Sequence, residues 1–181
     1  MSQPWKTLSR TPVFERGKWL RVEDHTVELP DGRIIEQWPW VITPDYVNVL
    51  ALTADEHFLF FRQRKYAIQG LTLAPVGGYI EPGEDPLVAA KRELLEETGY
   101  EAPDWIDLGR FRVDANRGAG TGYFYLARHA QYVTLRNADD LEEQELVYLT
   151  RAEVEKILDA GEFKLMAWTA IVALALRRLS A

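Results

Sequence analysis

The sequence predicts an α/β protein in which a mixed sheet packs against helices and a small antiparallel strand unit precedes it. Three observations support this fold class. Strand-like segments alternate with helix-like segments, an Asp31-Gly32 pair joins two strand-like segments near the N-terminus, and the pattern changes to buried strands after Pro44. We therefore expect residues 1–45 to form the small unit and residues 46–181 the main domain.

The N-terminal unit is predicted from three strand-like segments. Residues 13–22 and 23–30 come before the Asp31-Gly32 turn, and residues 33–42 follow it. Alternation on both sides of an Asp-Gly pair is a strong signal for a β-hairpin. Two or three strands bury little apolar surface by themselves. This unit should therefore pack on the main domain, on a second subunit or on both, and we expect a homodimer.

The main domain is predicted from β-branched and aromatic strands and three helices. Its expected strands are residues 47–53, 57–64, 107–114, 122–130 and 146–150. Thr150 and Glu153 have the spacing of a capping box, which begins a helix that ends near Ala160. A last helix is expected over residues 163–179.

Composition excludes several classes of protein. The chain has 181 residues, of which 47% are hydrophobic and 27% charged, as in an ordinary globular protein with one core. It has no cysteine, which excludes disulfides and thiolate sites and fits a cytoplasmic location. A net charge of −7 argues against a nucleic-acid partner. The apolar run 165–176 is too short to span a membrane, and the N-terminus lacks the apolar segment of a signal peptide.

The acidic segment after Gly77-Gly78 contains the candidate metal-binding residues. Asp85 as N-cap, Pro86 in the first turn and Gly99 after the last turn predict a helix over residues 86–98. Its three glutamates at positions i, i+3 and i+4 share one face and repel each other; they are Glu93, Glu96 and Glu97. A solvated acidic face is the alternative. A glycine turn with an exposed carbonyl beside three carboxylates instead suits a hard divalent cation such as Mg²⁺.

The spacing of this segment resembles the signature box of the Nudix hydrolases. The chain departs from that pattern at Tyr100, where the family has an aliphatic residue. The matching positions are Gly78, Glu84, Arg92, Glu93, Leu94, Glu96, Glu97 and Gly99.

The resemblance implies an α/β/α sandwich that hydrolyses a nucleoside diphosphate linked to another moiety. It implies that Mg²⁺ or Mn²⁺ is bound by Glu93, Glu96 and Glu97, joined by the carbonyl of Gly77. It also implies that Arg92 pairs with Glu84 and orients the other glutamates. A metal ion would neutralise the charge of the diphosphate and lower the pKa of the attacking water.

Residues 62–84 resemble the subgroup that hydrolyses ADP-ribose and other nucleoside diphosphate sugars, in which an N-terminal strand unit forms a domain-swapped dimer. Arg62 and Arg64 are candidate phosphate contacts, because arginine binds phosphate with two parallel hydrogen bonds; a solvated strand end is the alternative. Two features depart from the subgroup: Lys65 replaces its usual arginine, and residues 113–120 contain no proline.

Two further candidates for substrate contacts come from outside the box. Arg117 lies in a glycine-rich and therefore exposed loop. Trp38 and Trp40 alternate on one predicted strand and should face the same side. Trp38 is a candidate for stacking on the base, with a place in the core or in a subunit interface as the alternative for both tryptophans. His25, His57 and His129 lack the spacing of a zinc site, and we expect structural or surface positions for them.

The catalytic base is expected outside the box, since the box glutamates are occupied by metal. The resemblance implies a glutamate on a loop beyond the box, and residues 137–145 are the candidate segment, with Glu142 first and Glu143 and Glu145 as neighbours. A solvated acidic turn is the alternative. The competing functions are a triphosphate or dinucleotide pyrophosphatase and a noncatalytic nucleotide-binding module.

Overall fold

The computed structural model describes residues 4–136 and 144–180, which form two compact units. The first unit consists of residues up to Asp45 together with Phe111–Thr121. The second consists of Tyr46–Arg110 and the residues from Gly122 onward. The loop that carries Arg117 therefore belongs to the first unit.

The first unit contains a three-stranded antiparallel sheet of β1 (Lys6–Arg16), β2 (Leu20–Glu28) and β3 (Ile34–Ile42), in that order. The predicted hairpin at Asp31-Gly32 is confirmed: Gly32 has φ +83°, and Arg33 bonds the Asp31 carboxylate with its backbone and side chain. The prediction of one strand over residues 13–22 is wrong. A turn at Gly17, where φ is +49°, ends β1, and β2 begins three residues later.

The second unit is built on a mixed sheet, as the fold class predicts. Its main strand order is β11-β5-β4-β10-β8, with β6 beside β5, β7 beside β4 and β9 beside β10. The central pair β4 and β10 is parallel, whereas β10 with β8, β11 with β5, and β4 with β5 and β7 are antiparallel pairs. The strands are β4 (Tyr46–Thr53), β5 (Phe58–Gln63), β6 (Thr72–Ala74), β7 (Val76–Tyr79), β8 (Tyr100–Glu101), β9 (Asp104–Arg112), β10 (Thr121–Tyr132) and β11 (Gln144–Leu149).

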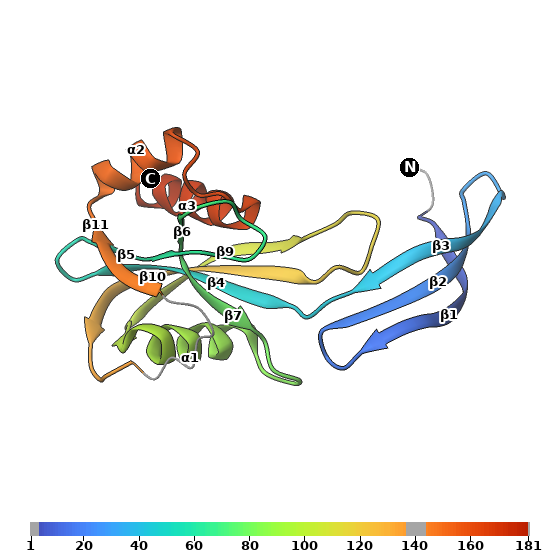
Figure 1. Cartoon of the computed structure of the whole chain (residues 1–181), viewed down its shortest axis with the longest axis horizontal. Coiled ribbons are helices and arrows are strands. Elements are labelled where there is room, and N and C mark those ends of the chain that lie inside the picture. The colour runs from blue at the N-terminus through green and yellow to red at the C-terminus, as the bar shows by residue number, and fades with distance from the viewer. Residues whose placement is uncertain (1–3, 137–143, 181) are drawn as a thin grey trace. The chain divides into compact units, whose positions relative to one another are not determined.

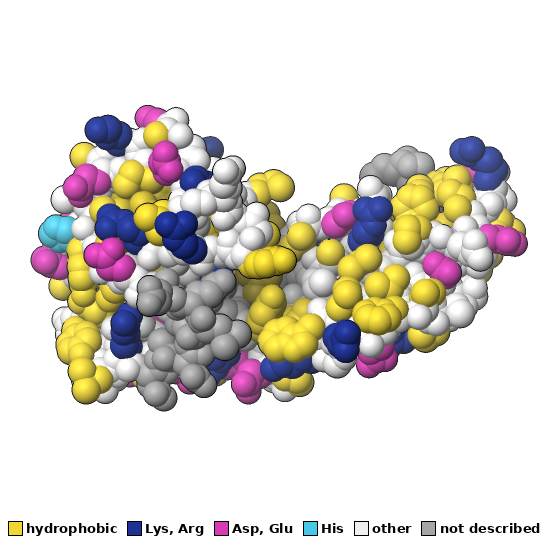
Figure 2. Space-filling model, viewed as in Figure 1, with side chains coloured by type: hydrophobic (Ala, Val, Ile, Leu, Met, Phe, Trp, Pro, Cys, Tyr) yellow, Lys and Arg dark blue, Asp and Glu magenta, His cyan; other side chains and the backbone are white. Residues whose placement is uncertain are grey.

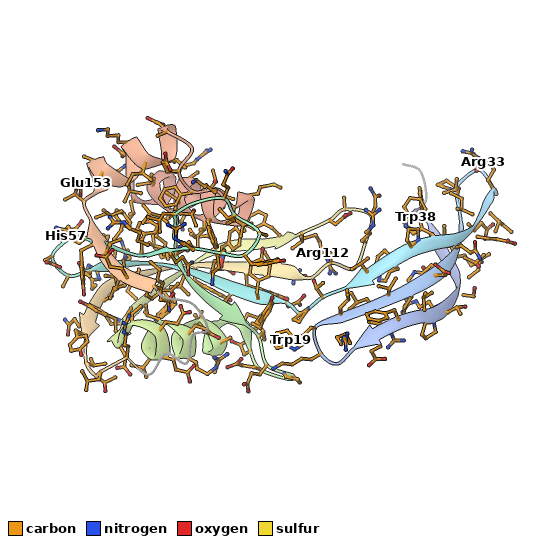
Figure 3. All side chains as sticks on the ribbon, viewed as in Figure 1. Trp19, Arg33, Trp38, His57, Arg112 and Glu153 are labelled. Atoms are coloured by element: carbon orange, nitrogen blue, oxygen red, sulfur yellow. The ribbon has the colours of Figure 1, made fainter. Side chains whose placement is uncertain are left out.

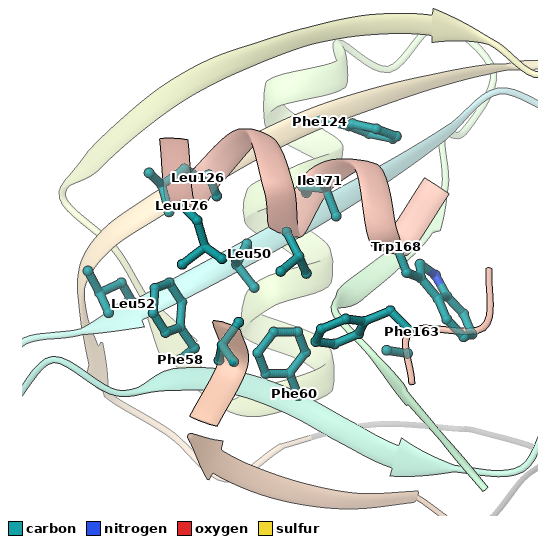
Figure 4. Packing of buried hydrophobic residues seen from close by; sticks show 14 residues of the cluster. Leu50, Leu52, Phe58, Phe60, Phe124, Leu126, Phe163, Trp168, Ile171 and Leu176 are labelled. Carbon is teal, nitrogen blue, oxygen red and sulfur yellow. The ribbon is translucent and has the colours of Figure 1, made fainter. Parts of the chain in front are cut away.

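Helices cover both faces of this sheet. Helix α1 (Pro86–Thr98) lies on one face, and α2 (Arg151–Asp159) and α3 (Met166–Leu179) lie on the other (Figure 1). Alternate residues of β4 enter the two cores, because neighbouring side chains of a strand point to opposite faces. Val47, Val49 and Ala51 pack with residues of α1. Leu50 and Leu52 pack with residues of α2 and α3, including Ile171 and Trp168 (Figure 4).

Local capping explains why α1 and α2 begin at their observed residues. Asp85 accepts hydrogen bonds from the backbone nitrogens of Leu87 and Val88, and Gly99 ends α1 in the left-handed conformation with φ +76°. The predicted capping box of Thr150 and Glu153 is formed at the start of α2. None of the helices within the described residues is long and apolar enough to cross a membrane.

Candidate functional site

The two glycines before the acidic segment lie in a strand, which corrects the prediction of a glycine turn. Gly77 and Gly78 belong to β7 and pair with Asn48 and Val47 of β4. A Cβ atom at Gly78 would lie 2.2 Å from the carboxyl carbon of Glu93, and one at Gly77 would lie 2.6 Å from the carbonyl oxygen of Val47. Glycine is needed here because neighbouring groups occupy the space that side chains would fill.

Arg92 connects most of the acidic side chains of the box. Its guanidinium donates two hydrogen bonds of 2.9 Å to the two carboxylate oxygens of Glu84. The same group donates to Glu93 at 2.7 Å and to Glu96 at 3.1 Å. It also reaches the carbonyl oxygen of Tyr79 at 3.3 Å, which fastens α1 to β7. The pairing of Arg92 with Glu84 that the family resemblance implies is therefore present.

The carboxylates around Arg92 have different pKa values for identifiable reasons. The hydrogen bonds from Arg92 hold the pKa of Glu84 below its ordinary value, and Glu84 in turn raises the pKa of the guanidinium. Burial raises the pKa of Glu93, and the hydrogen bond from Arg92 opposes this effect. Glu84 is therefore the ionic partner of Arg92. A cation bound beside Glu93 would favour the ionised carboxylate and so oppose the effect of burial on its pKa.

Glu97 is held by the backbone of β7. The N–H of Gly77 donates to its carboxylate at 3.2 Å. Because the N–H and C=O of one strand residue point to the same edge, the Gly77 carbonyl oxygen lies on the edge that faces Glu97. Carboxylate and carbonyl oxygens are the ligands that Mg²⁺ prefers.

The residues present fit a divalent cation in charge and in donor type. The Arg92 guanidinium bonds three carboxylates, those of Glu84, Glu93 and Glu96. A fourth carboxylate, that of Glu97, accepts from the Gly77 N–H, so the box carries excess negative charge. In residues 4–136 and 144–180, however, no three acidic or histidine side chains are already gathered for a metal ion. Hydrogen bonds from Arg92 hold Glu84, Glu93 and Glu96, and the Gly77 N–H holds Glu97.

The two arginines before the box differ in their surroundings. Arg62 of β5 forms a 2.9 Å ion pair with Glu145, its cross-strand neighbour in β11. Both side chains are largely exposed, at 47% and 65%. Arg64 follows the end of β5 and is exposed. Arg62 is therefore already engaged by one of the glutamates that sequence reasoning put forward as a base.

Trp38 and Arg117 belong to the first unit, where the loop after β9 packs against the three-stranded sheet. The indole nitrogen of Trp38, on β3 (Figure 3), donates to the carbonyl of Asn116 at 3.1 Å, and its ring meets Trp5 edge-on. Arg117 pairs with Asp114 at 3.0 Å within the same loop. Both candidates therefore have structural contacts inside their own unit.

The three histidines have different surroundings, and the buried one, His25, lies in β2. His25 is 3% exposed, bonds the Glu23 carboxylate at 2.7 Å and stacks on Trp40. Its hydrogen bond lowers the pKa of Glu23. His57, in the turn after β4, bonds the backbone of Asp55, while His129 is exposed.

The proposed base and one of its neighbours, Glu142 and Glu143, lie outside the described residues.

Sequence reasoning assigned no role to Asn48, a buried polar residue that pairs with Gly77. Its polar side chain among apolar strand residues was a signal available in the sequence.

Two family models together cover most of the chain. The model described as "NUDIX domain" matches residues 43–169, and the model described as "Nucleoside diphosphate sugar hydrolase N-terminal domain" matches residues 5–41. The two matches meet at Ile42, the last residue of β3.

Characterised relatives and a solved structure extend the similarity. The chain is 29% identical over 153 residues to a methanol dehydrogenase activator of Bacillus methanolicus, covering 84% of this chain and 80% of that protein. It is 28% identical over 157 residues to an ADP-ribose pyrophosphatase of Bacillus subtilis, covering 87% and 83%. A crystal structure of an ADP compounds hydrolase superposes with a TM-score of 0.84 at 22% identity, covering 99% of this chain and 96% of that one, which shows the shared fold.

Proposed function

The chain belongs to the NUDIX domain family, and from this premise we propose that it is a metal-dependent hydrolase of nucleoside diphosphate sugars, with ADP-ribose as the leading substrate. The observation that carries the proposal is the match of residues 5–41 to the N-terminal domain of nucleoside diphosphate sugar hydrolases. The named activity of the Bacillus subtilis relative, an ADP-ribose pyrophosphatase, supports the same substrate class.

The proposed metal ligands are the carboxylates of Glu93, Glu96 and Glu97 and the carbonyl oxygen of Gly77, with Mg²⁺ as the ion and Mn²⁺ as an alternative. A bound divalent cation would neutralise the diphosphate and lower the pKa of the attacking water. Glu84 would keep Arg92 in place, since it accepts two hydrogen bonds from the guanidinium. Arg92 would thereby orient Glu93 and Glu96 toward the ion.

The proposed reaction transfers one phosphoryl group to water. The oxygen of water forms a bond to one phosphorus of the diphosphate, the P–O bond to the bridging oxygen breaks, and that oxygen leaves with the second phosphate. The products are a nucleoside monophosphate and a sugar phosphate. Glu142 is the proposed acceptor of the proton from the attacking water, and Arg62 and Arg64 are proposed to bind phosphate oxygens.

For the first unit we propose two roles. Trp38 and Arg117 are its candidate substrate contacts. Its sheet is also the proposed surface for homodimer formation, because large apolar side chains are exposed on it (Figure 2). These exposed side chains are Trp5, Leu8, Val13, Phe14, Trp19 and Ile34.

The test is hydrolysis by the purified protein of a substrate panel in the presence of Mg²⁺. The panel should contain ADP-ribose, other nucleoside diphosphate sugars, dinucleotides and nucleoside triphosphates, with products separated by ion-exchange chromatography. We expect AMP and ribose 5-phosphate from ADP-ribose at the highest kcat/KM. Preference for a triphosphate or a dinucleotide would favour a house-cleaning pyrophosphatase, and binding of nucleotides without any hydrolysis would indicate a noncatalytic module.

A further inference from the structure

Asn48 is a buried amide in an otherwise apolar row of side chains. It is 4% exposed, and the next two residues of β4 on the same face, Leu50 and Leu52, are buried in the core. Its Nδ2 atom has no hydrogen-bond partner. Among residues 4–136 and 144–180, no other buried side-chain nitrogen or oxygen lacks a partner. An unpaired buried N–H is costly, so this group requires a partner that the folded chain does not supply.

The position of Asn48 places the amide beside the box. Its cross-strand neighbours are Gly77 of β7 and Phe124 of β10. A Cβ atom at Gly77 would lie 2.5 Å from Oδ1 of Asn48 and 3.4 Å from its Cγ. The amide oxygen therefore lies over β7 in space that any other residue at position 77 would fill, and the amide nitrogen is turned away from that strand.

The neighbouring glycine makes the same kind of space for Glu93 on the other face of the sheet. A Cβ atom at Gly78 would lie 2.2 Å from the carboxyl carbon of Glu93. Because Gly77 and Gly78 face opposite sides of β7, a single strand separates the Asn48 amide from a proposed metal ligand. Glu93 therefore lies on the opposite face of the sheet from the amide, and the direct neighbour of the amide in the box is Gly77, whose carbonyl oxygen is a proposed metal ligand.

The chemistry of an amide selects the part of the substrate that it would contact. An amide is neutral and offers N–H donors beside a carbonyl acceptor, which matches a hydroxyl group. Phosphate oxygens are better bound by a guanidinium. In a nucleoside diphosphate sugar, the groups bonded directly to the diphosphate are sugars, and these are what the amide would meet next to the box.

We propose that Asn48 is a specificity-determining residue whose amide nitrogen donates a hydrogen bond to a hydroxyl oxygen of the sugar next to the diphosphate. This inference rests on the proposed function for the identity of the substrate. It explains why a polar side chain occupies a buried position of β4 in line with Leu50 and Leu52. The competing explanation is a buried water molecule that satisfies the amide and has only a structural role.

The test compares Asn48→Leu and Asn48→Ala with a matched control, Thr53→Val. Thr53 lies in the same strand and is also 4% exposed, but its hydroxyl is satisfied by Asp55 at 2.6 Å and by the backbone N–H of His57 at 3.0 Å. Three quantities are measured for each protein: the Tm without ligand, the Kd for AMP and for ribose 5-phosphate by calorimetry, and the KM for ADP-ribose.

We expect Asn48→Leu to keep the wild-type Tm and to weaken binding of at least one of the two sugar phosphates by about 3- to 12-fold, the value of one neutral hydrogen bond. The KM for ADP-ribose should rise by a similar factor, and Asn48→Ala should show the same loss of affinity. Thr53→Val should lower the Tm and leave the affinities unchanged.

Unchanged affinities in both Asn48 variants would overturn the proposal, and a lower Tm with unchanged affinities would assign the amide to a structural water. The readouts separate this inference from the proposed function. If the wild type binds the sugar phosphates but does not cleave ADP-ribose, the proposed function fails while the affinities still decide the role of Asn48. Absence of binding by the wild type would overturn both.

Discussion

Replacing Gly78 by alanine should disable the box while leaving the fold almost intact. The new Cβ atom would lie 2.2 Å from both Cδ and Oε1 of Glu93 and 2.5 Å from Oε2. To reach an ordinary contact, the carboxyl group must move by about 1 Å, and a misplacement of that size costs about 10²-fold in rate or more. The φ angle of Gly78 is outside the left-handed region, so alanine can adopt the backbone conformation.

The stability cost of this substitution should be small, because a carboxyl group at the end of a flexible side chain can swing aside. The 2.7 Å hydrogen bond from Arg92 to Glu93 would be lost, at about 1–2 kcal/mol. For a chain of this length that lowers the Tm by less than about 8 °C. Gly77→Ala should be worse for folding, since its Cβ atom would meet the backbone carbonyl of Val47 at 2.6 Å.

The assay is steady-state hydrolysis of ADP-ribose with Mg²⁺, together with thermal unfolding and calorimetric Mn²⁺ binding. Gly83→Ala is the matched control, because Gly83 has φ +81° but a Cβ atom added there would meet no neighbouring group within 4 Å. It should lose stability without losing kcat/KM. A Gly78→Ala enzyme with wild-type kcat/KM and Mn²⁺ affinity would refute the assignment of Glu93 to the site.

Three further predictions concern Glu84, the proposed base and the first unit. Because hydrogen bonds from Arg92 lower the pKa of Glu84, the extra stability of wild type over Glu84→Gln should be present above about pH 5 and disappear as the pH falls through that lowered pKa; thermal unfolding across this range checks it, and a pH-independent difference would contradict it. Glu142→Gln should lower kcat by about 10²-fold or more with metal affinity unchanged, and wild-type rates in Glu142→Gln, Glu143→Gln and Glu145→Gln alike would return the role of base to the box. The apolar surface of the first unit predicts a homodimer, so light scattering that gives a monomer mass at micromolar concentration would remove that proposal.

Features set by local chemistry could be predicted from the sequence. The bounds of α1 follow from Asp85, Pro86 and Gly99, each of which acts on backbone groups within a few residues. The capping box of α2 and the turn at Gly32 are local in the same sense. The fold class followed from these elements and the change of pattern after the N-terminal unit.

Features set by distant neighbours could not be predicted. The glycine pair Gly77-Gly78 predicts a turn, but it lies in β7. Glycine is needed there because the side chains of Asn48 and Glu93 fill the space beside it, and the sequence does not show that these residues are neighbours. The Arg62 partner, Glu145, lies 83 residues away in the chain. Periodicity and turn signals carry no information on such pairs, which are fixed by strand register in the folded sheet.

The most direct test of metal-dependent cleavage at the diphosphate is the comparison of wild type with Glu97→Gln, in which a neutral amide keeps the shape of the carboxylate but loses its charge. Both proteins are incubated with ADP-ribose and Mg²⁺ in ¹⁸O-labelled water, with EDTA as the metal-free control, and circular dichroism checks their fold. The account predicts that wild type with Mg²⁺ forms AMP and ribose 5-phosphate, with ¹⁸O in one of the two phosphates, and that EDTA or Glu97→Gln abolishes turnover in a folded protein. Near-normal turnover by Glu97→Gln, or turnover that persists in EDTA, would contradict it.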